Sequence, residues 1–159
     1  MILVTLGTQD KQFKRLLDAV LNLDIDEKVI IQYGSTTLPN REFKENFEFH
    51  KFLSHDDFNK YMNDARLIIT HAGVGTIIEG LKKEKMMIVA ARMKKYNEHV
   101  NDHQFQILDT FSKEGYIIKL DDFSKLSELI KLDFKPKKFV SNKNNFNAYL
   151  EREIDKLLK

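Results

Sequence analysis

Residues 67–76 read Leu-Ile-Ile-Thr-His-Ala-Gly-Val-Gly-Thr, an apolar run that turns through two glycines into the next segment. The run Leu67–Thr70 is typical of a buried strand, and Ile77, Ile78 and Leu81 follow the glycines at helical spacing. A buried strand that passes directly into a helix is the repeating unit of sheets covered by helices on both faces. This stretch therefore predicts an α/β fold.

The same alternation of apolar runs and helical patterns extends in both directions along the chain. Further strands are predicted at Ile2–Leu6, Val29–Tyr33, Phe47–Phe52, Met86–Ala90 and Tyr116–Leu120. Helical spacing and capping residues predict helices over 11–22, after Ser54 and Asp57, over 102–113 ahead of Gly115, and around 124–130. Because the strands are short and mostly apolar on both faces, we expect an α/β doubly wound parallel sheet.

The length of 159 residues predicts one domain, which we expect to occupy residues 1–130. Residues 131–159 would add a basic connector and a final amphipathic helix, since they carry 8 Lys and Arg against 4 Asp and Glu, while residues 1–130 carry 18 against 20. This segment is a candidate contact with a partner, and packing on its own domain is the alternative interpretation. The apolar face of the final helix would consist of Phe146, Tyr149, Leu150, Ile154, Leu157 and Leu158.

The composition excludes several classes of protein. A hydrophobic content of 42% and a charged content of 31% indicate a soluble globular chain, and a net charge of +2 argues against a nucleic-acid binder driven by bulk charge. The absence of cysteine excludes disulfides, thiol nucleophiles and thiolate metal sites. Because the sequence shows neither a signal peptide nor an apolar run of about 20 residues, we expect a cytoplasmic protein unless a partner takes it to a membrane.

Two glycine-containing segments, Gly7-Thr8-Gln9 and 71–76, follow predicted strands. Open α/β sheets bind ligands at the carboxyl ends of their strands, and glycines at a helix N-terminus favour phosphate groups. The alternative is that the glycines only make tight turns. A dinucleotide fingerprint would require glycine in place of Ile78 and an acidic residue near Ala91-Arg92, and a P-loop would require Gly-Lys-Ser/Thr. The sequence therefore disfavours a nicotinamide-dependent oxidoreductase.

Acidic and neutral polar side chains lie near the same edge. Glu79 follows Gly75 by four residues, where a carboxylate can accept two hydrogen bonds from a ribose diol, or can be an ordinary surface residue. Residues 98–104, Glu-His-Val-Asn-Asp-His-Gln, suit sugar hydroxyls better than a metal, although a solvated loop and helix cap is the alternative. Asp24 and Asp26 form a D-x-D pair at the opposite edge, which we interpret as a solvated loop. No spacing is typical of a metal site, and no metal is expected.

Three ordered segments, Val4–Gln9, Ile69–Leu81 and Lys95–Gln104, resemble glycosyltransferase family 28, in particular its C-terminal, donor-binding domain. The resemblance covers about residues 1–120 and is greatest to the free-standing version of this domain. That version is the small catalytic subunit of two-part UDP-N-acetylglucosamine transferases of the dolichol pathway, with relatives in bacterial capsule and exopolysaccharide biosynthesis. The resemblance implies a Rossmann-like sheet, the C-terminal half of a GT-B fold, that binds UDP-GlcNAc, UDP-Gal or UDP-Glc.

The resemblance also implies roles for individual residues. The diphosphate would lie near Gly7, Thr8 and Gln9, the uracil near the backbone of Phe52 and Leu53, and the ribose at Glu79. The glycine-rich helix start would be His71, Ala72, Gly73, Val74, Gly75 and Thr76. The sugar would be read by Asp102, His103 and Gln104, and the predicted substrate-binding set is completed by Glu98 and His99. No catalytic base is assigned, and the candidates are His71 and His99.

The implied reaction is an inverting sugar transfer to a lipid-linked acceptor. Backbone N–H groups and a helix dipole would stabilise the charge on the departing UDP, and the acceptor hydroxyl needs a general base. A GT-B enzyme binds its acceptor on its other half, for which this chain has no room. The resemblance therefore implies a membrane-anchored, acceptor-binding partner subunit that recruits the chain to the cytoplasmic face of the membrane.

A second class of function is a non-catalytic accessory subunit that enhances a partner glycosyltransferase. The retained pattern at Glu79 and 71–76 argues against it. The chain departs from the family at Glu84-Lys85-Met86, at Ala91 and at Asn97, and these differences leave the identity of the sugar open.

Overall fold

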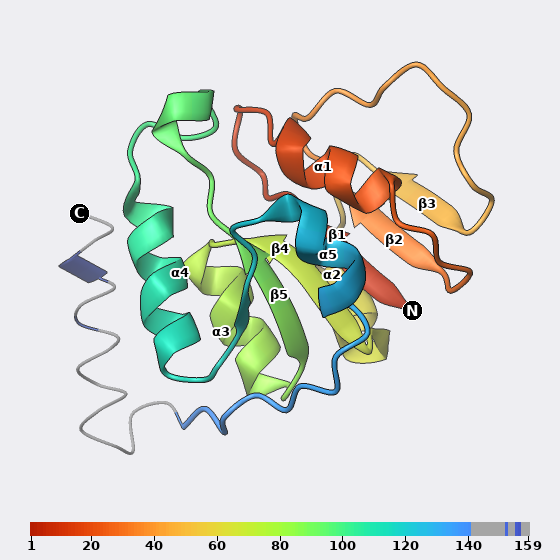
Figure 1. Cartoon of the computed structure of the whole chain (residues 1–159). Coiled ribbons are helices and arrows are strands. Elements are labelled where there is room, and N and C mark those ends of the chain that lie inside the picture. Colours follow the sequence, from red (N-terminus) through yellow and green to blue (C-terminus); the bar gives the residue numbers. More distant parts are fainter. Residues whose placement is uncertain (141–151, 153–154, 157–159) are drawn as a thin grey trace.

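A computed structural model of the chain describes residues 1–140, 152 and 155–156. Its centre is a parallel sheet of six strands in the order β3-β2-β1-β4-β5-β6 (Figure 1). This arrangement confirms the predicted α/β doubly wound sheet. The strands are β1 (Ile2–Thr5), β2 (Val29–Gln32), β3 (Phe47–His50), β4 (Leu67–His71), β5 (Met86–Ala90) and β6 (Ile118–Lys119).

The strand order reverses between β1 and β4, at the middle of the sheet. The chain proceeds from β1 outward through β2 to β3, then returns to β4 beside β1 and proceeds outward on the other side to β5 and β6. At the carboxyl ends of this central pair, Thr5 of β1 is in register with Thr70 of β4. A reversal of this kind leaves a crevice beyond the strand ends, because the two following loops diverge to opposite sides. Both glycine segments start there.

Helices cover both faces of the sheet (Figure 1). One face is covered by α1 (Lys14–Leu21), the 3₁₀ helix η2 (Phe123–Lys125) and α5 (Leu126–Leu129), and the other by α2 (His55–Asp64), α3 (Val74–Lys82) and α4 (His103–Lys113). Successive strand residues point to opposite faces. Ile2 and Val4 accordingly pack into the core layer under α1, and Leu3 into the layer under α3 and α4. Both the odd and the even positions of a central strand must therefore be apolar, because each set faces one of the two core layers.

Helix α1 begins three residues later than predicted, at Lys14 instead of residue 11. Phe13 is fully buried, and its N–H donates to Thr36 Oγ1 at 3.0 Å, so the backbone is held in a loop up to that point. The predicted start of α2 is confirmed, because Ser54 Oγ accepts from Asp57 N at 3.1 Å.

Strand β6 is shorter than the predicted run Tyr116–Leu120. Gly115 adopts φ +80° after α4, and Tyr116 N donates to Phe111 O, so these two residues complete the end of the helix instead of starting a strand. Tyr116 and Ile117 remain buried against α4.

Residues 131–140 cross from α5 toward α4 past the amino-terminal ends of the strands (Figure 1). Lys137 N donates to Gly115 O at 3.0 Å, and the Phe139 ring lies 5.9 Å from that of Tyr116. The residues predicted to form the apolar face of a final helix, from Phe146 to Leu158, lie outside the described residues. Within the part of the chain that the structure describes, no helix is long and apolar enough to cross a membrane.

Candidate functional site

A cleft of about 510 Å³ lies at the carboxyl ends of β1 and β4, where the strand order reverses. Its walls come from the ends of four neighbouring strands, β1, β2, β3 and β4, and the segments that follow them. Eight predicted site residues line it, namely Gly7, Thr8, Gln9, Leu53, His71, Gly73, Gly75 and Thr76. The structure thus brings the two glycine segments together in one cleft, although they are more than 60 residues apart in sequence.

The imidazole of His71 lies between the two glycine segments. A Cβ atom on Gly7 would lie 2.7 Å from His71 Nε2, and one on Gly73 would lie 2.4 Å from His71 Cε1. Gly7 also adopts φ +86°, a conformation that costs residues with a side chain. These two glycines are therefore required by the close approach of a buried histidine, which is a more specific reason than a tight turn.

His71 is 7% exposed, and burial lowers its pKa from 6.5 to about 4, with the charge of Arg92 acting in the same direction. The ring is consequently neutral at physiological pH. Its Nδ1 atom lies 3.1 Å from Gln104 Nε2. Its Nε2 atom is on the side of the glycine segments and has no hydrogen-bond partner among the described residues.

Helix α3 begins at the rim of this cleft with Gly73 as its N-cap. No side chain caps the helix, and its first turn contains no acidic residue. The N–H groups of the first turn, including those of Gly75 and Thr76 in the cleft lining, therefore remain available, and the helix dipole favours an anion there. This arrangement, which faces the first glycine segment across the cleft, can bind a phosphate or diphosphate group.

The floor of the cleft is a hydrogen-bonded pair that the sequence analysis missed. Thr5 Oγ1 donates to Gln32 Oε1, and Gln32 Nε2 donates to Gly7 O at 3.0 Å, so the end of β2 fixes the first glycine segment. His55 and Phe58 of α2 also line the cleft and were missed. Because Thr5 and Gln32 are polar residues at the carboxyl ends of otherwise apolar central strands, they could have been found from the strand-end rule.

The predicted sugar-reading residues of the segment 98–104 do not line the cleft. Glu98 is 3% exposed and forms a bidentate ion pair with Arg15, with contacts of 2.7 and 2.6 Å, while it also accepts from Met93 N at 3.0 Å. Asp102 Oδ1 accepts from Lys94 N at 2.8 Å, next to the 3₁₀ helix η1 (Lys94–Tyr96). These carboxylates hold the loop after β5 in place.

His99 and Gln104 are also engaged within the protein through their side chains, and His103 is engaged through its backbone. His99 Nδ1 accepts from Asn101 N at 3.3 Å, and burial lowers the pKa of His99. The N–H of His103 donates to Asn101 Oδ1 at the start of α4. Gln104 is 4% exposed and contacts His71 from behind the cleft. Only Gln104 of these residues reaches a side chain in the cleft lining.

Arg92, two residues after the end of β5, has a buried side chain that the sequence analysis did not assign. It is 1% exposed, and its guanidinium donates to the carbonyl oxygens of Leu6, Lys11 and Glu98. Burial lowers its pKa to about 10, which leaves it charged at neutral pH. Arg92 thus ties the loop after β1 to the loop after β5. An arginine shortly after an apolar strand is the only sequence signal for this role.

The remaining predicted residues lie around the cleft. Glu79 is on the outer part of α3, is 40% exposed and pairs with Lys83 at 3.5 Å. Phe52 is 51% exposed after β3, with Lys51 Nζ 5.9 Å from its ring centre. Ala72 is buried in the core and Val74 packs against it.

The D-x-D pair lies before β2, at the opposite edge from the cleft. Asp24 pairs with Lys44 at 2.7 Å, which lowers the pKa of Asp24, and Asp26 is exposed. Among the residues that the structure describes, no group of three or more His, Cys, Asp or Glu side chains is placed to hold a metal ion.

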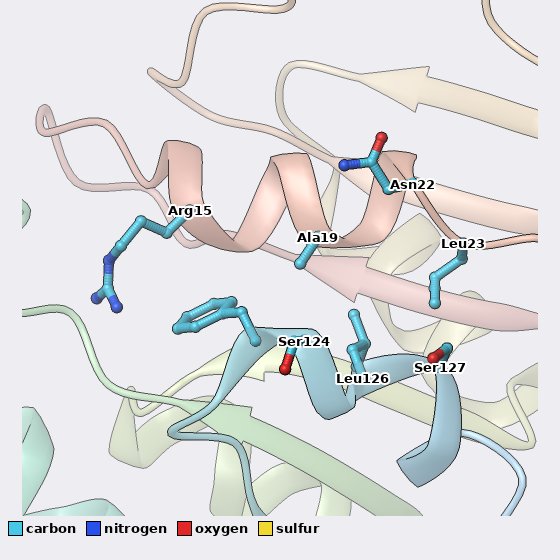
Figure 2. Close-up of a pocket in the computed structure, with 8 residues that line it drawn as sticks. Arg15, Ala19, Asn22, Leu23, Ser124, Leu126 and Ser127 are labelled. Atoms are coloured by element: carbon cyan, nitrogen blue, oxygen red, sulfur yellow. The ribbon is translucent and has the colours of Figure 1, made fainter.

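A second hollow, of about 320 Å³, lies between α1 and α5 (Figure 2). Ala19, Leu23 and Leu126 form its apolar part, and Arg15 stands at one end. No predicted site residue lines it, and it is on the face of the sheet rather than at the strand ends. Arg15, the charged residue of this lining, is paired with Glu98.

The model of the glycosyltransferase family 28 C-terminal domain matches residues 1–157. Curated relatives are UDP-N-acetylglucosamine transferase subunits ALG13. The protein of Mus musculus is 30% identical over 90 residues, which cover 56% of this chain and 7% of the relative. The protein of Homo sapiens is 29% identical over 125 residues, which cover 73% of this chain and 10% of the relative. That of Debaryomyces hansenii is 27% identical over 113 residues, 70% and 49%. The chain thus spans less than half the length of each of these relatives.

Solved structures share the fold at lower sequence identity. An NMR structure of ALG13 has a TM-score of 0.59 and 22% identity, with 96% of this chain and 94% of that chain covered. The glycotransferase of kitacinnamycin has a TM-score of 0.64 and 20% identity, and the calicheamicin glycosyltransferase CalG4 has 0.60 and 16%. Both alignments cover 99% of this chain, and they cover 38% of the kitacinnamycin enzyme and 37% of CalG4. The predicted fold, one half of a GT-B enzyme, is confirmed.

Proposed function

This chain belongs to the glycosyltransferase family 28 C-terminal domain family, and we propose that it is the donor-binding subunit of a two-component glycosyltransferase that uses a UDP-sugar. The observation that carries the proposal is the cleft between β1 and β4, in which two glycine segments and the uncapped start of α3 converge. Such a site favours a diphosphate. The relatives are UDP-N-acetylglucosamine transferase subunits, which supports UDP-GlcNAc as donor over UDP-Gal or UDP-Glc.

The proposed chemistry is displacement of UDP from the anomeric carbon by an acceptor hydroxyl, with inversion. The bond to the diphosphate oxygen breaks as the acceptor oxygen attacks, and the electron pair remains on UDP. Preorganised N–H groups stabilise that charge because they need no reorientation during the reaction. The first turn of α3 provides such groups, and we propose that no divalent ion is needed.

Glu79 is the proposed ribose ligand, although its carboxylate points to Lys83 in this structure. An ion pair that is 40% exposed on the glutamate side contributes little free energy, so the carboxylate is free to exchange this partner for a diol.

The proposed acceptor site lies on a partner subunit. The cleft lining contains no carboxylate that could act as a general base for an acceptor hydroxyl. We propose a membrane-anchored subunit that binds a lipid-linked acceptor, supplies the base and recruits this chain to the cytoplasmic face of the membrane. The word "subunit" in the relatives' names supports a two-part enzyme. Capsule or exopolysaccharide synthesis is the proposed setting.

Titration calorimetry of the isolated chain with UDP, and with ADP as a control for base selectivity, tests donor binding. We expect UDP to bind and ADP to bind at least tenfold more weakly. A folded chain that binds no UDP would favour the alternative, a non-catalytic accessory subunit.

Transfer assays test the rest of the proposal. The purified chain alone should be nearly inactive, and co-expression with its partner should restore transfer and move the chain to the membrane fraction. Transfer by the assembled enzyme should persist in chelator. Restoration of lost activity by manganese would revive Asp24 and Asp26 as a metal site.

A further inference from the structure

The amide of Gln104 has only one possible orientation. Its Oε1 accepts from the backbone N–H of Arg92 at 3.1 Å, and its Nε2 lies 3.1 Å from His71 Nδ1. A backbone N–H group can only donate, so the oxygen of the amide must face Arg92 and the NH₂ group must face His71. Because Gln104 is 4% exposed, water cannot easily replace either partner.

This orientation fixes the tautomer of His71. The NH₂ group of Gln104 donates, and Nδ1 of His71 must therefore carry a lone pair and accept. A neutral imidazole has one N–H, which is then at Nε2. The Nε2 atom lies on the side of Gly7 and Gly73, in the lining of the cleft. His71 thus presents a hydrogen-bond donor to the cleft, and no lone pair.

The charged and titratable groups that act on His71 favour the same neutral state. Arg92 at the end of β5 and His99 in the following loop both oppose protonation of the ring, as does burial. The NH₂ group of Gln104 cannot accept from a proton at Nδ1, so this contact does not favour the charged ring either. Arg92 is itself tied to the carbonyl groups of Leu6 and Lys11, so the same residue places the first glycine segment and the amide that orients His71.

We propose that Gln104 is a positioning residue that holds His71 as a neutral Nε2–H donor toward the diphosphate of the donor, and that Gln104 does not read the sugar. This inference rests on the proposed function for the identity of the ligand. It replaces two hypotheses from the sequence, that Gln104 reads the sugar and that His71 is a candidate base. His71 becomes a diphosphate ligand instead of a general base, because an Nε2 that already carries a proton cannot accept one from an acceptor hydroxyl.

The test compares the wild-type chain with the Gln104→Glu variant by NMR of ¹⁵N-labelled histidine, in the full chain without ligand. In the wild type the His71 ring should show the Nε2–H tautomer at pH 7. In Q104E one carboxylate oxygen still accepts from Arg92 N–H and the other accepts from a proton at His71 Nδ1. The tautomer should therefore change, and the pKa of His71 should rise by at least one unit.

Binding of UDP supplies a second readout. At pH 8, a neutral ring with its proton at Nδ1 turns the Nε2 lone pair toward the diphosphate, and Q104E should bind UDP about tenfold or more weakly than wild type. Below the raised pKa of His71 in Q104E, which the NMR titration locates, the doubly protonated ring donates from Nε2 again, and the ratio of the two dissociation constants should approach one. If Q104E bound UDP weakly because its structure was disturbed, lowering the pH would not restore its affinity.

Gln106→Glu is the matched control, because Gln106 is exposed on the same helix and the change in charge is identical. It should alter neither the tautomer of His71 nor the affinity for UDP. An Nδ1–H tautomer in the wild type would overturn the proposal, and this measurement requires no variant to fold. Q104E that binds UDP normally at pH 8 while losing discrimination among UDP-sugars would overturn it in favour of sugar reading. Wild-type chain with the expected tautomer but no UDP binding would instead refute the proposed function.

Discussion

The loops after β4 and β5 begin side by side on neighbouring strands, and the structure uses them in opposite ways. The loop after β4 is short and turns its backbone into the cleft, where Gly73 and Gly75 line the site. The loop after β5 is long and turns two charged side chains inward, so that Arg92 and Glu98 bond to the protein itself, while the exposed Asp102 accepts from the backbone N–H of Lys94. Polar residues at a strand end can thus either contact a ligand or support the neighbouring loop that does.

The largest effect on stability should come from Arg92, the centre of the supporting loop. In the Arg92→Met variant the carbonyl groups of Leu6, Lys11 and Glu98 lose their charged donor while remaining inside the protein. We expect the free energy of unfolding in urea to fall by about 3–5 kcal/mol. Arg41→Met is the control, since this exposed arginine should change stability by no more than about 0.5 kcal/mol. Equal values for the two variants would refute the supporting role.

The next largest effect separates two glutamates that follow the two strands. Glu98→Ala removes both contacts to Arg15 and the acceptor of Met93 N, and should lower the free energy of unfolding by about 2–3 kcal/mol. Glu79→Ala removes only an exposed pair and should leave stability within about 0.5 kcal/mol.

The two glutamates should have the reverse ranking when binding is measured. Glu79→Ala should weaken UDP binding by about 1–3 kcal/mol in calorimetry, through loss of two hydrogen bonds to the ribose diol. Unchanged UDP affinity in folded E79A would show that the ribose assignment is wrong. Glu98→Ala should affect binding only to the extent that the loop after β5 moves.

The two loops also differ in how well their roles could be predicted from the sequence. The strands, the helices of residues 1–130 and the two glycine segments follow from hydropathy and local spacing, and they are present in the structure apart from the differences at α1 and β6. The roles of Glu98 and Gln104 could not be predicted, because their partners Arg15 and His71 are 83 and 33 residues away. A polar side chain near a strand end has the same local pattern whether it faces the cleft or the core.

A third, smaller effect concerns pH and the buried ring of His71 in the cleft lining. The pKa of His71 is about 4 in the folded chain and about 6.5 when unfolded, so below pH 6.5 the unfolded chain takes up a proton that the folded chain does not. Stability is therefore complete above about pH 7 and decreases as the pH falls toward 4. Between pH 8 and pH 5, the free energy of unfolding in urea should fall by about 2 kcal/mol more in the wild type than in the His71→Asn variant. If the free energy of unfolding changes with pH in the same way in both proteins, a group other than His71 causes the pH dependence.

The smallest effect distinguishes the two glycines of the loop after β4. Gly73→Ala places a methyl group 2.4 Å from His71 Cε1, so the ring must shift, and the free energy of unfolding should fall by about 1–2 kcal/mol. At Gly75 nothing lies within 4 Å of a new Cβ, and alanine in the first turn of α3 should raise stability by about 0.5 kcal/mol because it restricts the unfolded chain. The same methyl group projects into the open cleft, where a diphosphate must approach the N–H groups of α3 closely. Gly75→Ala should therefore weaken UDP binding in calorimetry although the protein becomes more stable. If instead it binds UDP as tightly as wild type, the diphosphate does not lie at the start of α3.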